Sequence, residues 1–324
     1  MADEMRALIT GVCGFVGGYL SERLVSGGYK VFGTRRSSEP LSGLASVKGK
    51  VKLLECDLTD VASLEKAVKK AKPDLVFHLA AQSSVTASWQ APQETLSTNI
   101  VGTVNLLEAL RKYGCDARIQ VSGSSDEYGL VYASEVPIKE TNPLRPLSPY
   151  GVSKVATDLL ACQYCKSYGL KTVVTRSFNI EGPGRGEAFA TSNFSKQIAE
   201  IEAGLRKPVV SVGNLDAVRD YSDVRDVVVA MELAALKGEP GEAYNVCSGK
   251  GLKVRQMLDL LLGRSTEKIL VKPDPARMRP ADVPLLIGDS TKLRKRTGWA
   301  PKIPFEKTMG DMLDYWRARV ASKR

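Results

Sequence analysis

Residues 10–17 read TGVCGFVG, and this glycine-rich stretch directly follows the short apolar run Ala7–Thr10. Apolar residues then recur at the spacing of one helix face, which predicts the order strand, turn, helix. In such a turn Gly11 allows a tight bend, Gly14 lets the backbone approach a pyrophosphate, and Gly17 lets the helix pack on the strand. The start of the helix offers free N–H groups to an anion. No Lys-Ser or Lys-Thr pair follows, which argues against a nucleoside-triphosphatase loop and favours a dinucleotide-binding turn.

Outward from this turn, the first half of the chain alternates short apolar runs with longer helical patterns, as in a parallel sheet covered by helices. Strands are predicted at Ala7–Thr10, Lys30–Thr34, Val51–Glu55, Leu75–Leu79, Arg118–Ser122 and Thr172–Arg176. Near residues 179–186 the composition shifts to Gly, Pro and Arg, and helices are predicted near 191–203, 223–237 and 254–262. The expected fold is α/β: a Rossmann-type doubly wound parallel sheet with a smaller, mixed α/β C-terminal substrate lobe.

The same pattern predicts two domains. Residues 1–178 are expected to form the dinucleotide-binding Rossmann domain and residues 179–324 the substrate-binding lobe. Parts of residues 223–248 are expected to return to the Rossmann domain.

Length and composition are those of an ordinary globular protein. The chain has 324 residues, 43% of them hydrophobic and 25% charged, which excludes a stapled mini-protein and global disorder. It contains no run of eighteen apolar residues, so no membrane span is expected. Its N-terminus has no signal-peptide pattern, and a cytoplasmic location is therefore predicted.

The charge balance favours an anionic partner without choosing one. The formal net charge is +10, but the basic residues are spread along the chain and no nucleic-acid-binding motif accompanies them. We therefore expect a solvated basic surface with a few anion-binding arginines, and no nucleic acid. The six cysteines have neither disulfide-framework nor zinc spacing, and the pair Cys162 and Cys165 lies inside a helical pattern, so no metal site is predicted.

The end of the second predicted strand indicates which dinucleotide is preferred. An acid there holds the ribose 2′-hydroxyl of NAD, whereas arginine suits the 2′-phosphate of NADP. Arg35 and Arg36 stand at this place, so NADP is predicted, with NAD as the alternative if the arginines are only exposed loop residues. Asp57 and Leu58 follow the third strand and would contact the adenine; the alternative is that Asp57 or Asp60 caps the next helix.

A tyrosine and a lysine four residues apart point to acid–base chemistry. Tyr150 and Lys154 begin a helix after Pro149 and share one face of it. A nearby ammonium group stabilises a phenolate, and so suits tyrosine to proton transfer. Ser124 lies at the carboxyl end of the fifth predicted strand, where open α/β sheets assemble their sites, and is predicted to polarise a carbonyl. The single histidine, His78, lies in an apolar run and is interpreted as a core residue.

Five motifs together resemble the extended short-chain dehydrogenase/reductase family, in its nucleotide-sugar-modifying branch. They are TGVCGFVG at 10–17, HLAAQSSV at 78–85, SPYGVSK at 148–154, Phe178-Asn179, and RDYSDVRD at 219–226. In the second half, the stretches at 212–217, 244–249, 279–284 and 297–301 most resemble the GDP-4-dehydro-6-deoxy-D-mannose reductases, with the GDP-mannose 4,6-dehydratases as near relatives.

The resemblance implies roles for individual residues. It makes Ser124, Tyr150 and Lys154 the catalytic triad, with Asp126 as a further acid. It places Tyr150 and Lys154 also against the dinucleotide, together with Gly11, Gly14, Phe15, Val16, Gly17, Arg35, Asp57, Leu58, Leu79, Ala80 and Ala81. The residues that it implies for the substrate's sugar and GDP are Ser83, Ser125, Asn179, Lys196, Arg219, Arg279 and Asp282.

The implied activity is the reduction by NADPH of the 4-keto group of a GDP-4-dehydro-6-deoxy-hexose, to GDP-D-rhamnose or a relative. The main alternative is a GDP-mannose 4,6-dehydratase with bound NADP. Dehydratases have a glutamate two positions after the catalytic Ser/Thr, where this chain has Asp126 followed by Glu127, and either acid is a candidate for that role. Further alternatives are a nucleotide-sugar epimerase and a non-catalytic NADP-binding module.

The resemblance also implies a homodimer, with a tetramer as the alternative. The expected contacts are the helix that carries Tyr150 and the helix near Pro92–Tyr113.

Overall fold

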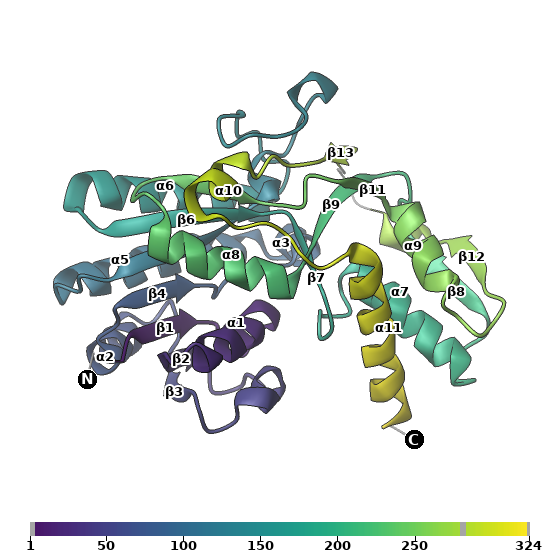
Figure 1. Cartoon of the computed structure of the whole chain (residues 1–324), viewed down its shortest axis with the longest axis horizontal. Coiled ribbons are helices and arrows are strands. Elements are labelled where there is room, and N and C mark those ends of the chain that lie inside the picture. The colour runs from purple at the N-terminus through teal and green to yellow at the C-terminus, as the bar shows by residue number, and fades with distance from the viewer. Residues whose placement is uncertain (1–3, 279–282, 323–324) are drawn as a thin grey trace.

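The computed structural model describes residues 4–278 and 283–322. Its main feature is a seven-stranded parallel sheet with the strand order β10-β6-β5-β4-β1-β2-β3 (Figure 1). The strands are β1 (Arg6–Thr10), β2 (Lys30–Arg35), β3 (Lys52–Glu55), β4 (Leu75–His78), β5 (Arg118–Ser124), β6 (Lys171–Ser177) and β10 (Ala243–Val246). The six strands predicted from the apolar runs are therefore confirmed, each within two residues at either end.

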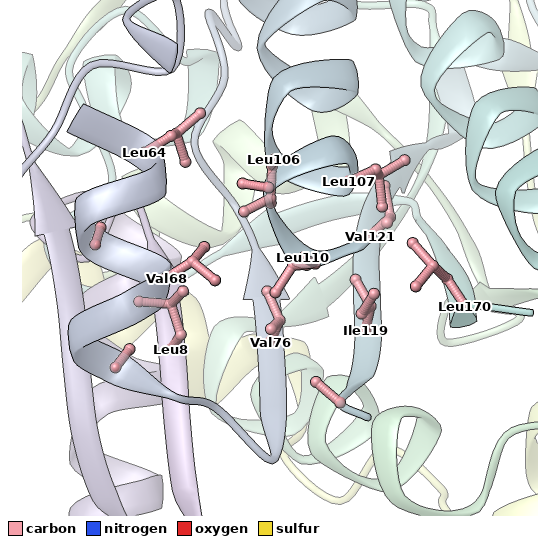
Figure 2. Packing of buried hydrophobic residues seen from close by; sticks show 14 of the residues in the cluster. Leu8, Leu64, Val68, Val76, Leu106, Leu107, Leu110, Ile119, Val121 and Leu170 are labelled. Atoms are coloured by element: carbon pink, nitrogen blue, oxygen red, sulfur yellow. The ribbon is translucent and has the colours of Figure 1, made fainter. Parts of the chain in front are cut away.

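Helices cover both faces of this sheet because successive strand residues point in opposite directions. On one face, Leu8 packs with apolar residues of α2 (Val61–Ala71) and α5 (Gly102–Lys112), as Figure 2 shows. Helix α6 (Pro149–Tyr168) adds Ala161 and Tyr164 to the same cluster. On the other face, Ile9 packs with residues of α1 (Phe15–Ser26) and α8 (Val224–Lys237). The Rossmann-type doubly wound sheet expected from the sequence is confirmed.

The remaining strands are short and form two small sheets beside the large one. Strand β9 (Val218–Asp223) pairs with β7 (Asn179–Glu181), β11 (Gly251–Lys253) and β13 (Leu285–Leu286), while β8 (Val209–Val212) pairs with β12 (Leu270–Pro273). Around them pack α7 (Ala190–Glu202), α9 (Val254–Leu262) and α11 (Phe305–Ala321), which share a separate apolar core. Helix α10 (Thr291–Thr297) packs on α8 instead.

The segment that joins the two parts of the chain returns to the large sheet. Helix α8 packs on β6, β5 and β4, and β10 pairs with β6 at the sheet edge. The polypeptide therefore passes from the large sheet to the small ones and back before it ends in α11 (Figure 1).

Candidate active site

The glycine-rich turn after β1 has the geometry that the sequence predicts. Gly11 has φ +68°, and a Cβ atom there would lie 2.8 Å from Ala80 Cα. A Cβ at Gly17 would lie 2.5 Å from the Gly11 carbonyl oxygen. Helix α1 has Gly14 at its N-cap and no side chain capping it, so its first N–H groups are open to an anion.

A cavity of about 820 Å³ runs from this turn along the carboxyl ends of the parallel strands to the small sheets. Each residue that the sequence assigned to the dinucleotide lines it: Gly11, Gly14, Phe15, Val16, Gly17, Arg35, Asp57, Leu58, Leu79, Ala80, Ala81, Tyr150 and Lys154.

Local sequence signals bring the three presumed catalytic side chains to this cavity. Ser124 is the last residue of β5. Helix α6 begins at Pro149, which occupies its first turn, and Ser148 caps the helix by accepting a 3.0 Å hydrogen bond from the Gly151 N–H. Lys154 Nζ donates to the Ser122 carbonyl oxygen at 2.7 Å and lies 5.8 Å from the centre of the Tyr150 ring. Ser124, Tyr150 and Lys154 all line the cavity.

The electrostatics of Tyr150 differ from the expectation that Lys154 would lower the pKa of its phenol. Burial, with the nearby carboxylate of Asp126, raises the pKa of Tyr150 above its ordinary value, and a hydrogen bond with Ser124 opposes that shift only in part. Burial also lowers the pKa of Lys154 to about 8. Lys154, whose Nζ donates to the Ser122 carbonyl oxygen, is not among the groups that shift the pKa of Tyr150. Tyr150 is therefore a protonated phenol at neutral pH, which is the form that can donate a proton.

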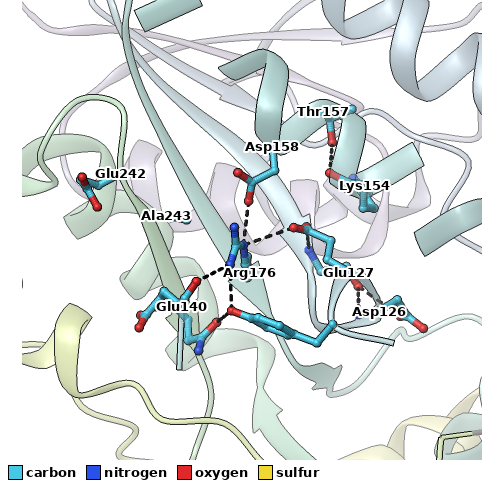
Figure 3. Close-up of polar contacts among 12 residues, drawn as sticks. Asp126, Glu127, Glu140, Lys154, Thr157, Asp158, Arg176, Glu242 and Ala243 are labelled. Carbon is cyan, nitrogen blue, oxygen red and sulfur yellow. Dashed lines mark hydrogen bonds and ion pairs between the residues drawn. The ribbon is translucent and has the colours of Figure 1, made fainter. Parts of the chain in front are cut away.

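The structure separates the predicted catalytic acid Asp126 from its neighbour Glu127, the alternative for the same role. Asp126 lines the cavity, and its Oδ2 accepts a 3.1 Å hydrogen bond from Ser124 Oγ. Glu127 is fully buried behind the turn, where Oε1 accepts the Ser124 backbone N–H at 2.7 Å. Its Oε2 lies 3.2 Å from Arg176 Nε (Figure 3). Only Asp126 is placed to act on a molecule in the cavity.

The residues assigned to the substrate fall into three groups. Ser83, Ser125, Asn179 and Arg219 line the cavity. Lys196, on α7, does not line it, and its ammonium pairs with Glu187. Arg279 and Asp282 lie outside the described residues.

His78 is a core residue, as predicted. Its ring is hydrogen-bonded on both sides, by Thr10 Oγ1 at 2.8 Å and Thr103 Oγ1 at 3.0 Å. Burial lowers its pKa to about 3, so the imidazole is neutral at physiological pH. The cysteine pair at 162 and 165 lies within α6 as expected, and both thiols are free.

Sequence reasoning missed Arg185 and Phe189, which also line the cavity. The Arg185 guanidinium lies 3.5 Å from the centre of the Phe189 ring and 5.3 Å from that of Phe15, and its buried Nε has no hydrogen-bond partner. A buried cationic group that faces a cavity suits an anionic or carbonyl ligand. The only signal for it was the shift to Gly, Pro and Arg near residue 180.

The part of the chain that the structure describes lacks both a metal-site cluster and a membrane-spanning helix. It contains no cluster of three His, Cys, Asp or Glu side chains suited to a metal ion. None of its helices has both the length and the apolar character needed to cross a bilayer.

Comparison with known proteins gives a consistent picture. The family model described as GDP-mannose 4,6 dehydratase matches residues 8–312. The GDP-6-deoxy-D-mannose reductase of Pseudomonas aeruginosa is 35% identical, over 97% of this chain and 98% of that protein. The human GDP-mannose 4,6 dehydratase is 34% identical, over 95% of this chain and 90% of that protein.

Solved structures agree with these sequence matches. The structure of RMD from Pseudomonas aeruginosa complexed with NADPH superposes with a TM-score of 0.84 at 32% identity, covering 97% of this chain and 100% of that one. The UDP-glucose 4-epimerase of Thermotoga maritima, solved with UDP-glucose, gives a TM-score of 0.87 at 32% identity, covering 98% and 100%.

Proposed function

The chain belongs to the GDP-mannose 4,6-dehydratase family of extended short-chain dehydrogenase/reductases, and on this premise we propose that it is a nucleotide-sugar reductase. Its substrate is a GDP-4-dehydro-6-deoxy-hexose, and its product is GDP-D-rhamnose or a close relative. The observation that carries the proposal is the meeting of Ser124, Tyr150 and Lys154 in one cavity, beside the glycine-rich turn.

The residues around the turn fit NADPH. A Cβ at Gly11 or Gly17 would collide with the backbone of Ala80 or of the turn itself, so these glycines keep the turn tight, and the uncapped start of α1 offers N–H groups to a pyrophosphate. Arg35 and Arg36 line the same end of the cavity and would hold the 2′-phosphate. When bound, the cofactor supplies the hydride.

Each side chain of the triad has its own role in the reaction. Tyr150 donates the proton to the oxygen of the 4-keto group. The Ser124 hydroxyl, which donates to Asp126 in this structure, would turn to that oxygen and stabilise the charge that develops there by a hydrogen bond. Lys154, with its Nζ 5.8 Å from the centre of the Tyr150 ring, would hold a ribose hydroxyl of the bound cofactor. With its pKa above the ordinary value, the Tyr150 phenol is protonated before the reaction begins, as proton donation requires.

The second lobe would bind the nucleotide and the sugar. Arg219, on β9, suits phosphate oxygens, and Asn179, on β7, is fixed by a 3.2 Å hydrogen bond to the Asp220 carbonyl oxygen. Ser83 and Ser125 add hydroxyl groups to the same cavity. Arg279 and Asp282 are assigned to the diphosphate and the nucleoside ribose by the family resemblance alone.

The second candidate function is that of a GDP-mannose 4,6-dehydratase with bound NADP. The specific observation that favours it is Asp126, the acid two positions after Ser124, which lines the cavity and bonds the Ser124 hydroxyl. Against it, aspartate reaches one methylene less far than the glutamate of that enzyme group, and Glu127 is withdrawn from the cavity.

One assay separates the two. The purified protein is mixed with NADPH and GDP-4-dehydro-6-deoxymannose, and a parallel sample receives GDP-mannose alone. The reductase consumes NADPH only with the keto sugar, which is followed at the nicotinamide absorbance band. No net consumption, with GDP-mannose converted to the keto sugar, would identify the dehydratase and make Asp126 its acid–base.

We also propose the organisation of the whole molecule. Residues 1–178 bind NADP and residues 179–324 bind the nucleotide sugar, with parts of 223–248 belonging to the first domain. The position of α8 and β10 on the large sheet supports this division.

A homodimer located in the cytoplasm completes the proposal, with α5 and α6 as the contact. Support comes from three exposed apolar side chains on and next to these helices, Val101, Val152 and Leu159. Light scattering of the purified chain would test the assembly.

A further inference from the structure

A cluster of charged side chains is buried behind the Ser124 turn. Glu127 is fully buried, and Asp158 and Arg176 are 5% and 6% exposed. None of the three lines the cavity. Figure 3 shows the Arg176 guanidinium between the carboxylates of Glu127 and Asp158. Such a cluster costs desolvation energy, and apolar residues often stabilise a core as well, so stability alone does not account for it.

Glu127 holds the backbone of a residue placed in the catalytic triad. Its Oε1 accepts the Ser124 N–H at 2.7 Å. Strand β4 ends at His78, opposite Val121, so pairing with β4 stops three residues before Ser124. A side chain therefore fixes the strand end where the neighbouring strand on that side has stopped.

The space around this carboxylate is closely filled. A Cβ at Gly123 would lie 2.6 Å from Glu127 Oε1. At the same turn, Ser124 Oγ accepts the Asp126 N–H at 3.2 Å and donates to Asp126 Oδ2 at 3.1 Å. The backbone of Ser124 is thus held from behind while its hydroxyl stays on the cavity side.

Arg176 connects the turn to the helix that carries the other two triad residues. Its Nε donates to Asp158 Oδ2 at 2.7 Å, and Asp158 lies on α6, four residues after Lys154 and eight after Tyr150. Arg176 Nη1 also donates to the Glu140 carbonyl oxygen at 3.0 Å. The cluster therefore joins the end of β5, strand β6 and helix α6.

We propose that Glu127 is a positioning residue for the reaction: its carboxylate reaches the Ser124 N–H and so sets the Ser124 hydroxyl relative to Tyr150. The inference rests on the proposed function of this site. Glu127 touches neither substrate nor cofactor and acts only through Ser124. The reaction needs the hydrogen bond from the Ser124 N–H to Glu127 Oε1, and it does not need the negative charge of Glu127.

Two conservative variants separate reach from charge. Glu127→Asp keeps the charge beside Arg176 but withdraws the carboxylate by one methylene. Glu127→Gln loses the charge but keeps an oxygen that can accept the Ser124 N–H. We expect kcat of Glu127→Asp to fall about 10- to 100-fold, as for a misplaced catalytic group, and kcat of Glu127→Gln to stay within about threefold of wild type. NADPH affinity, measured by fluorescence, should change less than about threefold in both, because Glu127 lies outside the cavity.

Glu140→Asp is the matched control, since Glu140 Oε1 also accepts a backbone N–H, from Asn245 at 2.8 Å, away from the cavity. Its kcat should stay within about twofold of wild type. A double variant tests the route: in a Ser124→Ala background, Glu127→Asp should slow turnover no further, because the two changes remove one interaction.

Three results would overturn the proposal. Glu127→Gln could be as slow as Glu127→Asp, which would make the charge decisive. A second result is that Glu127→Asp slows the Ser124→Ala enzyme as much as it slows wild type, which would mean that Glu127 does not act through Ser124. The third is that Glu127→Asp turns over at the wild-type rate.

Hydrogen exchange makes the test independent of the assigned activity. Amides of residues 122–129 should exchange faster in Glu127→Asp and not in Glu127→Gln. If the wild-type chain does not reduce the keto sugar, the proposed function fails, while this exchange and dehydratase turnover still test Glu127. Equal exchange in Glu127→Asp and wild type would contradict the contact itself.

Discussion

The cavity has two sides that are built differently. The turn side, formed by residues 11–17 and 79–81, consists largely of backbone at the ends of parallel strands. The lobe side, formed by Asn179, Arg185 and Arg219, consists of long polar side chains carried by short strands and loops. Backbone recognition depends on close approach, so it should be sensitive to single added atoms. Side-chain recognition depends on charge, so it should be sensitive to truncation.

The triad lies between the two sides, and its removal should have the largest effect. Tyr150→Phe is expected to lower kcat about 10³-fold, because the proton donor is lost, while NADPH binding persists. Stopped-flow turnover and a binding titration measure the two quantities. Tyr164→Phe, on the same helix but bonded to Glu108, is the control. Wild-type rates in Tyr150→Phe would remove Tyr150 from the mechanism.

On the turn side, the addition of one methyl group should weaken NADPH binding. Gly11→Ala places a Cβ against Ala80 at a backbone φ of +68°, which we expect to raise the Kd for NADPH about 100-fold through roughly 2–3 kcal/mol of strain. Gly28→Ala is the control, since it has φ +80° and no atom within 4 Å of its Cβ. If the two variants bind NADPH equally well, close approach is not what the turn provides.

The lobe side should instead respond to the loss of a charge. Arg219→Ala is expected to raise KM for the nucleotide sugar about 30-fold, the usual loss for a charge-assisted hydrogen bond, with NADPH binding unchanged. Lys196→Ala should change KM less than about twofold, because Lys196 lies outside the cavity and pairs with Glu187. Steady-state kinetics with each substrate varied in turn measure both, and the reverse ranking would contradict this division of the cavity.

Arg35 and Arg36 are the exception on the turn side, since they contribute charge. Arg36 Nε pairs with Glu39 at 3.1 Å, and both arginines line the cavity. Replacing both with Ala should lower the preference for NADPH over NADH about tenfold. Lys48→Ala with Lys50→Ala removes the same charge elsewhere and should leave the preference unchanged, as measured by the ratio of kcat/KM. An unchanged ratio in the arginine variant would contradict the assignment of Arg35 and Arg36 to the 2′-phosphate of NADPH.

The smallest effect concerns the stability of the turn side. The pKa of His78 is about 3 in the folded chain and about 6.5 in an unfolded one. The unfolded state therefore binds an extra proton at His78 below pH 6.5, and the folded state does not. The free energy of unfolding is unaffected by His78 above that pH and decreases as the pH falls below it. Between pH 6.5 and 5.5 the loss is about 1 kcal/mol. Urea unfolding at both pH values should show it in wild type, and His78→Gln should lack it.

Most of the turn side could be read from the sequence. The glycine spacing, the apolar runs and the Ser148-Pro149 helix start are local signals, and each determines a backbone conformation within a few residues of itself. Because strand ends in a parallel sheet meet at one edge, Ser124 and Tyr150 could also be predicted to lie close together.

The orientation of the other side chains at the cavity depends on contacts with residues far away in the sequence. The sequence favours Asp126 as the acid of the site and leaves Glu127 as an alternative, and packing against Arg176, 49 residues further along the chain, withdraws Glu127 from the cavity. Lys196 has the right charge for a diphosphate but lies on a face of α7 where Glu187 pairs with it. Arg185 belongs to a segment whose composition shows no regular pattern.

By itself, the sequence determined the parallel sheet and the dinucleotide-binding turn, because short-range sterics and the apolar period specify them. The family resemblance, not sterics, predicted the residues of the triad. The tertiary structure decided which of two adjacent acids lines the cavity, that Lys196 lies outside it, and which side chain accepts the Ser124 N–H. A side chain's direction depends on the partners that desolvate or pair it, and in this chain those partners come from elements far apart in sequence.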